Sequence, residues 1–287
     1  MKNSLKNGRG FEWSIDSKPT LNSNIFSEIW SYRDLLSLLV KRDIITFYKQ
    51  TILGPLWFFI QPLLTTIVFT FVFGNLGGFS TDGIPQPLFY LAGITFWNYF
   101  SDCLIKTSTV FRDNSNLFSK VYFPRIIIPF SIVISSLVKF SVQFILFMLM
   151  SLYYFIFLHQ SSQINEFVLL FPLLLLIMAL LGLGIGMLVS ALTTKYRDLS
   201  FLISFAVQLL MYTTTVVYPL SFVGSKIHWI VLLNPMTALI ETFRFGFFGV
   251  ATFHWGYLLY SFFIALMLFI IGSILFNKVE RSFVDTI

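Results

Sequence analysis

The chain has 287 residues, of which 56% are hydrophobic and only 11% are charged, and its mean hydropathy is +0.81. A soluble domain of this size would need more polar surface, so the composition excludes the ordinary soluble classes and predicts a protein made mostly of membrane-spanning helices. The net charge of +6 suits anionic lipid headgroups better than nucleic acid. We therefore expect membrane lipids, and no nucleic acid, among its partners.

The N-terminal part is polar. Residues 1–24 lack the apolar core and cleavage site of a secretory signal and predict a flexible cytoplasmic arm. Residues 25–43 predict an amphipathic helix with Trp30 near one end and too many charges to cross a bilayer. Such a helix is typical of the cytoplasmic membrane interface. Packing against a partner subunit is the alternative, and both can hold.

Six apolar segments follow, and a helix needs about 20 mostly apolar residues to cross a bilayer. They are residues 57–74, 88–107, 126–157, 167–191, 199–220 and 256–276. A cytoplasmic N-terminus puts most of the 19 Lys and Arg residues on the inner side, so the positive-inside rule places both termini in the cytoplasm. The predicted fold class is an all-α integral membrane protein with six transmembrane helices.

The inner connector at residues 106–125 is rich in basic and aromatic residues. Asp113, Asn114 or Ser115 can cap a short helix that runs through Leu117, Phe118 and Val121 and that Pro124 ends, which predicts a short amphipathic cytoplasmic helix. Aromatic side chains exposed on a short polar loop usually indicate a partner surface. Here these are Phe118, Tyr122 and Phe123, beside Arg112, Lys120 and Arg125.

The third apolar segment carries a polar stripe at a spacing of four, formed by Ser131, Ser135, Lys139 and Gln143. A lysine inside a span ordinarily faces a bundle interior or an aqueous path. Alternatively, Lys139 lies shallow enough for its ammonium group to reach the cytoplasmic interface. The sequence does not separate these two interpretations.

Residues 221–255 are apolar, but Asn234-Pro235 and the charged Glu241 and Arg244 interrupt them. A seventh crossing would also put the basic C-terminal residues outside. We therefore predict a re-entrant hairpin of two short helices on the outer side, bordering a pathway. In the fourth apolar segment, Gly182, Gly184 and Gly186 predict close helix packing rather than a nucleotide loop.

Aromatic residues make up 19% of the chain. Many lie towards the outer side, where their rings can either stack on sugar faces or form the aromatic belt of a membrane protein. They include Tyr90, Phe96, Trp97, Tyr99, Tyr218, Phe222, Trp229, Phe243 and Trp255.

No catalytic constellation and no Walker A sequence is found in the chain. The three His residues lack metal-ligand spacing, and the single Cys103 fits a packing role. We expect no catalytic residue, no bound metal and no cofactor. If the protein moves a substrate, the energy comes from another chain.

Four ordered motifs carry a family resemblance: KRDIITFYKQTILGPLW at 41–57 followed by Gln61-Pro62, NLFSKVYFPR at 116–125, KYRDL at 195–199 and NPMT at 234–237. Together they resemble type-2 ABC exporter permeases that export lipid-linked polysaccharides such as O-antigen, capsule and teichoic acid precursors. The likeness covers roughly residues 25–280.

The resemblance implies a homodimer in the bacterial inner membrane, with residues 50–279 as the transmembrane domain and two separate cytoplasmic ATPase subunits that hold ATP and Mg. The substrate would be an undecaprenyl-linked polysaccharide. The 112–124 helix would be the coupling helix, with Arg112, Asp113, Asn116, Phe118, Lys120, Tyr122, Phe123 and Arg125 as docking residues. The interfacial helix would bound a lateral entrance through Trp30, Arg33, Lys41, Arg42, Tyr48 and Lys49. The candidate channel or gate residues are Lys139, Gln143, Tyr218, Trp229, Asn234, Pro235, Glu241 and Arg244.

Two other functions are considered. A type-2 ABC exporter of drugs or lipids would share the six-span plan but usually lacks the Phe-Pro-Arg segment at residues 123–125 with this interfacial helix. A membrane-embedded transferase acting on lipid-linked sugars would need acidic or His residues clustered at one membrane face. In this chain Asp82, Asp102, Glu166 and Glu241 are scattered along the sequence.

Overall fold

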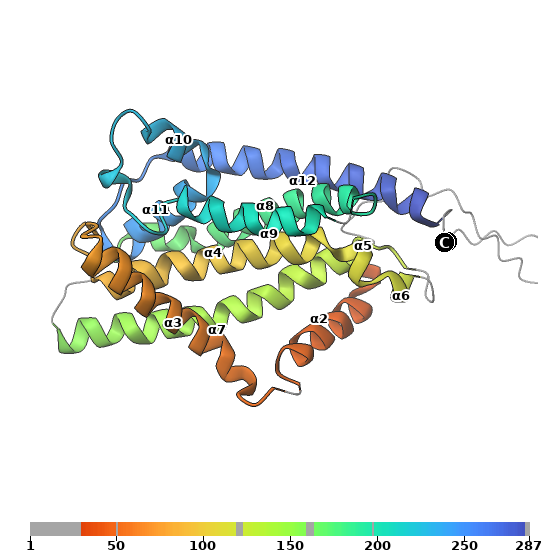
Figure 1. Cartoon of the computed structure of the whole chain (residues 1–287), viewed down its shortest axis with the longest axis horizontal. Helices are drawn as coiled ribbons and strands as arrows, with labels where there is room; N and C mark the ends of the chain where they lie inside the picture. The colour runs from red at the N-terminus through yellow and green to blue at the C-terminus, as the bar shows by residue number, and fades with distance from the viewer. Residues whose placement is uncertain (1–29, 50, 119–122, 159–163, 197, 285–287) are drawn as a thin grey trace, which may run out of the picture.

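The computed structural model describes residues 30–49, 51–118, 123–158, 164–196 and 198–284, and within these ranges it contains helices and no strand. Four long helices run along the long axis of the molecule (Figure 1). They are α4 (Gln86–Ser108), α7 (Ile127–Phe157), α8 (Phe171–Thr193) and α12 (Trp255–Val284).

Shorter elements gather at the two ends. The connector helices α5 (Val110–Asp113) and α6 (Ser115–Phe118) lie near the C-terminus at one end, and α10 (His228–Leu233) and α11 (Pro235–Phe248) lie at the opposite end (Figure 1). The inclined helices α2 (Arg33–Tyr48) and α3 (Trp57–Phe69) flank the bundle on one side. Remaining short elements are η1 (Gly54–Leu56), η2 (Thr70–Leu76), η3 (Glu166–Leu170) and η4 (Leu220–Phe222).

Four helical segments are long and apolar enough to cross a membrane: Gly54–Leu76, Ile127–Phe157, Glu166–Thr193 and Trp255–Glu280. They coincide closely with four of the predicted apolar segments. A helix also occupies the predicted segment 88–107, because α4 spans Gln86–Ser108, but α4 is less apolar and carries Asp102 and Lys106.

The predicted segment 199–220 is helical only as far as Tyr212, because α9 (Leu199–Tyr212) ends eight residues before the end of the segment. Its 14 residues form a helix of about 21 Å, shorter than the hydrocarbon core. Turns follow from Thr213, and their Thr214–Val217 stretch is buried.

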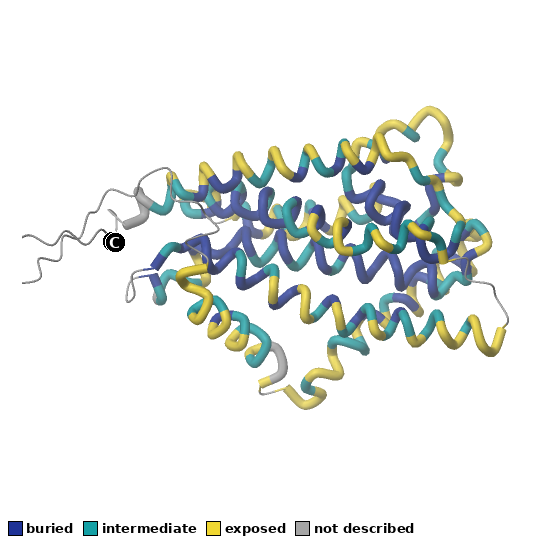
Figure 2. Tube along the Cα trace, turned by 180° about the vertical axis from the view of Figure 1, so that it is seen from behind, coloured by how far each residue is buried: buried dark blue, intermediate teal, exposed yellow. Residues whose placement is uncertain are grey.

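The burial pattern makes α4 the central helix (Figure 2). Most of its side chains are enclosed by neighbouring helices, whereas α3, α9 and α12 each keep an exposed apolar face. Neither of the two roles considered for the outer aromatic rings, sugar stacking or the membrane belt, fits those of α4, because they are buried in the protein. Tyr90, Phe96, Trp97 and Tyr99, together with Phe243 of α11, are at most 4% exposed.

Glycines allow the three central helices to approach at backbone distance. A Cβ atom on Gly182 would lie 2.6 Å from Cys103 Cβ of α4, and one on Gly186 would lie 2.6 Å from Thr107 Cβ. A Cβ on Gly184 would lie 2.6 Å from backbone atoms of Leu268 and Phe269 in α12. The predicted role of these glycines in close helix packing is confirmed.

This packing predicts that Gly272→Ala in α12 destabilises the protein, because the new Cβ would meet the backbone of Gly184. Overpacking of this kind costs about 1–3 kcal/mol. The change should lower the thermal unfolding temperature in detergent, although alanine is the better helix former. The matched control is Gly256→Ala in the first turn of the same helix, where nothing lies within 4 Å of the new Cβ. Equal melting temperatures for the two variants would contradict the packing argument.

Candidate functional site

The predicted docking helix at 112–124 is not one continuous helix. α5 ends at Asp113 and α6 begins at Ser115, and Asn114 between them accepts the first backbone hydrogen bonds of α6 from Leu117 and Phe118. Asn116 lies in α6. The candidate residues Lys120 and Tyr122 fall outside the described residues.

The expectation that the connector exposes its aromatic rings is wrong for Phe118 and Phe123, which are only 9% and 5% exposed. They belong to an apolar cluster in which Phe111 stacks on Phe276 of α12 at 4.5 Å between ring centroids. The Arg125 guanidinium lies 4.7 Å from the centroid of the Phe118 ring. The C-terminal part of α12 covers these rings and removes them from water. Burying the apolar surface of the rings is energetically favourable, so they are not exposed to a partner.

The connector surface that stays exposed is polar. Arg112 and Asp113 form an ion pair at 2.9 Å, and their side chains are 49% and 51% exposed. Arg112 Nη1 also donates to Ser200 Oγ at 3.0 Å, which ties the connector to the start of α9. Arg112 and Asp113 are therefore charged groups that a partner at this end of the molecule can reach.

The N-terminal amphipathic helix extends beyond its predicted end at residue 43, because α2 runs to Tyr48 and Lys49 is its C-cap. It packs against the inner half of α7, where Leu39 is 5% exposed in the same apolar cluster as Phe118. Lys41 and Arg42 point outward, and the Arg42 side chain binds Asp43 at 2.8 Å.

Before α2, the exposed Trp30 ring lies 5.6 Å from the Arg33 guanidinium. The exposed apolar side chains Trp30 and Leu38, at 71% and 65%, are suited to lipid headgroup and acyl contacts.

Lys139 forms an ion pair with Asp102 of α4 at 2.8 Å, and the two side chains are 14% and 23% exposed. One turn further along α7, Gln143 Oε1 accepts from Asn98 Nδ2 at 3.3 Å. The polar stripe thus faces α4 inside the bundle. Asp102 was not predicted as the partner of Lys139. The signal available in the sequence was that Asp102 is a second charged residue in a neighbouring apolar segment.

The hairpin breaks at Asn234-Pro235, where the helices α10 and α11 meet, and Asn234 Oδ1 caps α11 by accepting from the Met236 N–H at 3.1 Å. Glu241 and Arg244, in contrast, do not interrupt a helix. Both lie inside α11 and are 3% and 1% exposed.

Arg244 joins three parts of the chain. Its guanidinium donates to the carbonyl oxygens of Phe89 in α4 and Val216 at 3.2 and 3.4 Å, and also to that of Thr215. It lies 3.5 Å from the centroid of the Phe89 ring and 3.4 Å from Glu241 Oε1. The planar, five-donor guanidinium is the side chain suited to several acceptors at once.

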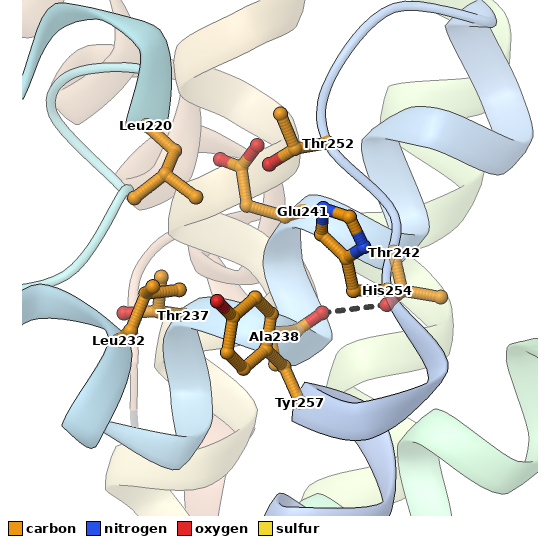
Figure 3. A pocket seen from close by; sticks show the side chains of 9 residues that line it. All are labelled: Leu220, Leu232, Thr237, Ala238, Glu241, Thr242, Thr252, His254 and Tyr257. Carbon is orange, nitrogen blue, oxygen red and sulfur yellow. Dashed lines mark hydrogen bonds between the residues drawn. The ribbon is translucent and has the colours of Figure 1, made fainter. Parts of the chain in front are cut away.

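Glu241 also lines a small pocket beside the hairpin, together with Thr252, His254 and Tyr257 (Figure 3). Its cavity volume of about 10 Å³ is close to that of one water molecule. The pocket is therefore too small for a sugar ring. Nearby, Trp229 is 60% exposed in α10, and the Tyr218 hydroxyl donates to the Tyr212 carbonyl at 3.2 Å.

Long apolar helices around an enclosed central helix, with a connector at one end and a helical hairpin at the other, indicate a multi-pass membrane protein. The sequence profile of the family described as ABC-2 type transporter matches residues 34–248. The chain therefore belongs to the ABC-2 type transporter family.

Relatives extend over most of the chain. A Klebsiella pneumoniae protein named O-antigen export system permease protein RfbA is 26% identical over 253 residues, which cover 88% of this chain and 94% of that protein. A protein of the same name from Myxococcus xanthus is 29% identical over 224 residues, 77% of this chain and 83% of that protein.

Family membership makes this chain the transport subunit of an ABC transporter rather than an enzyme. It works with an ABC ATPase that handles ATP, and permeases of this kind bind no cofactor. Among the described residues, no group of three or more His, Cys, Asp or Glu side chains could hold a metal ion.

The position of Arg244 predicts that Arg244→Ala destabilises the protein by about 3–5 kcal/mol, because Glu241 would remain buried without its cation. Arg244→Lys should recover little of this, since an ammonium group cannot reach the carbonyls of Phe89, Thr215 and Val216 together. Glu241→Gln should destabilise the protein less than Arg244→Ala does, since Arg244 keeps its hydrogen bonds to the three carbonyl oxygens. Thermal unfolding in detergent measures all three, and wild-type stability of Arg244→Lys would contradict the argument.

The Lys139–Asp102 pair predicts that Lys139→Ala lowers stability by leaving a carboxylate unpaired in the bundle, and that adding Asp102→Asn restores much of it. Thermal unfolding and transport are measured on both variants, with Lys195→Ala at an exposed position as control. A stable double variant with reduced transport would place Lys139 on the substrate path. Normal transport by that variant would leave the pair a structural role only.

Proposed function

We propose that the protein is the transmembrane subunit of an ATP-driven exporter that moves a lipid-linked polysaccharide, O-antigen or a similar surface glycan on undecaprenyl, across the bacterial inner membrane. The observation that carries this proposal is the similarity over 88% of the chain to a permease named for O-antigen export. The working unit would be a homodimer with two copies of the ATPase subunit.

In this proposal the chain crosses the membrane six times, through α3 with η2, α4, α7, α8, α9 and α12, with both termini in the cytoplasm. The exposed apolar faces of α3, α9 and α12 support contact with lipid or with a second copy. Because α9 is short, its crossing would be completed by the buried turns at residues 213–220. α10 and α11 would form the re-entrant hairpin, in which Arg244 keeps buried backbone carbonyls hydrogen-bonded.

The ATPase would dock at the connector end of the molecule. The exposed Arg112 and Asp113 would make direct contacts, while Phe118, Phe123 and Arg125 would hold the connector in shape from within. Exposed charges suit a contact with a groove on a soluble partner, because complementary charges fix the orientation in which the two proteins bind.

The lipid carrier would enter beside α2, where the exposed Lys41 and Arg42, and Trp30 just before the helix, can contact headgroups. Among the aromatic candidates at the outer end, Tyr218, Phe222, Trp229 and Trp255 are not enclosed in the core. These rings are available to the glycan as it leaves. The channel or its gate would also depend on side chains that hold its wall in place without facing the substrate. These are Lys139, Gln143 and the hairpin residues Asn234, Pro235, Glu241 and Arg244.

Deleting the gene should leave lipid-linked glycan in the cytoplasmic leaflet, and the wild-type gene should restore the glycan to the cell surface. Arg112→Glu should fail to restore it and should lose the ATPase subunit during co-purification, because the reversed charge faces the docking surface. Surface glycan and retained ATPase are measured on the same strains.

The control for this experiment is Lys226→Glu, the same charge reversal at an exposed position on the outer side. It should retain the ATPase. Unchanged surface glycan after gene deletion would contradict the proposed substrate, whereas ATPase retention by Arg112→Glu would contradict only the docking surface.

A further inference from the structure

α12 is held at its inner end by a reciprocal contact with the connector. The Glu280 carboxylate accepts the backbone N–H of Arg125 at 3.1 Å. In return, Arg125 Nη1 donates to the Glu280 carbonyl oxygen at 3.3 Å. Arg125 is only 6% exposed, and its guanidinium also covers Phe118.

Two helix ends explain why this contact is stable. α7 begins two residues after Arg125 and has no side-chain cap of its own, and the N-terminal end of a helix favours a negative charge. The last turns of α12 carry carbonyl groups that favour a cation. Glu280 supplies the anion to the start of α7, and Arg125 supplies the cation to the end of α12.

The outer end of α12 is attached to the hairpin. The Tyr260 hydroxyl donates to the Leu233 carbonyl at 3.1 Å. The single Ser261 hydroxyl proton is shared between the Pro235 carbonyl at 3.0 Å and the Tyr257 carbonyl of its own helix at 2.9 Å. The Leu233 and Pro235 carbonyls flank the break at Asn234 between α10 and α11. The contact therefore lies at the joint of the hairpin rather than along one of its helices.

α12 is one continuous helix of 30 residues that contains no proline, and the part of it between these attachments is about 30 Å long. A Gly/Ser pair such as Gly272-Ser273 is a place where a long helix can bend, and there the backbone of α12 lies directly against Gly184 of α8, which supports it. A displacement of one end is therefore transmitted to the other end with little bending.

We propose that α12 is the rigid connection between the ATPase-docking connector and the outer hairpin, with Glu280 and the Tyr260–Ser261 pair as its two attachment points. This inference rests on the proposed function of the connector and the hairpin. Glu280, Tyr260 and Ser261 are then positioning residues, which act through Arg125 and through the α10–α11 joint.

The test uses the complex with its ATPase in nanodiscs, with a fluorophore that senses its environment at Lys226→Cys beside α10. Cys103, the only cysteine in the chain, is replaced by serine. ATP should change the fluorescence of this parent complex. Glu280→Ala and the Tyr260→Phe/Ser261→Ala pair should each reduce the ATP-dependent change and glycan export about two- to tenfold, while ATP hydrolysis continues.

Combining the two sets of changes is the decisive measurement. Distant, independent sites give multiplying effects. If one rigid helix links them, the combined variant should be no worse than the more impaired of its two parents. Multiplying reductions, or an undiminished fluorescence change in Glu280→Ala, would overturn the proposal.

Controls separate other causes. Ser273→Ala removes a hydroxyl that bonds only within α12, to the Phe269 carbonyl at 2.7 Å, and Glu166→Gln removes an exposed carboxylate outside both contacts. Neither should alter the signal. If Glu280→Ala does not assemble, Glu280→Gln keeps an acceptor and should give a smaller loss of the same kind. If the reductions in fluorescence change do not multiply but the parent complex exports no glycan, the result would support the proposed role of α12 and contradict only the proposed substrate.

Discussion

The hairpin end of the molecule depends on one buried guanidinium. Arg244 lies inside α11 and bonds to carbonyl oxygens of α4 and of the turn that follows α9. Backbone groups that leave a helix at membrane depth need partners from the protein, since hydrocarbon supplies none. Arg244, with several donors in a fixed geometry, supplies these partners to the turn after α9. Without it, the backbone of that turn would have to be helical or exposed to water.

The middle of the bundle depends on a different constraint, the close approach of backbones. In lipid, helices gain little from burying apolar surface against each other, so small residues and polar contacts decide which faces meet. Gly182 and Gly186 face α4, and Gly184 faces α12. The Lys139–Asp102 pair then joins α7 to the same α4. α4 can therefore carry two charged residues within a membrane bundle because its neighbours enclose it.

How much of this the sequence predicts depends on whether a feature is local. The apolar segment at 126–157 and the break at Asn234-Pro235 follow from length and from proline, and both agree with the helix bounds. The burial of Phe118 and Phe123 could not be predicted, because it depends on the end of α12, about 150 residues away in sequence. Likewise, the sequence indicated that Glu241 and Arg244 interrupt an apolar segment. Their burial inside α11 could not be predicted, because the partners of Arg244 at Phe89 and Thr215 lie in other elements.

These charged contacts share one property: each joins elements that are distant in sequence. Arg244 links α11 to α4, Lys139 links α7 to α4, and Glu280 links α12 to the connector. A charge inside a membrane bundle is costly unless paired, so a pair that persists fixes the relative position of two helices more strictly than apolar contact does. α4 receives two of these links and is held on several sides. α12 is tied near both ends and packed on α8 through glycine between them, which is why we propose that it connects the two ends of the molecule as one rigid element.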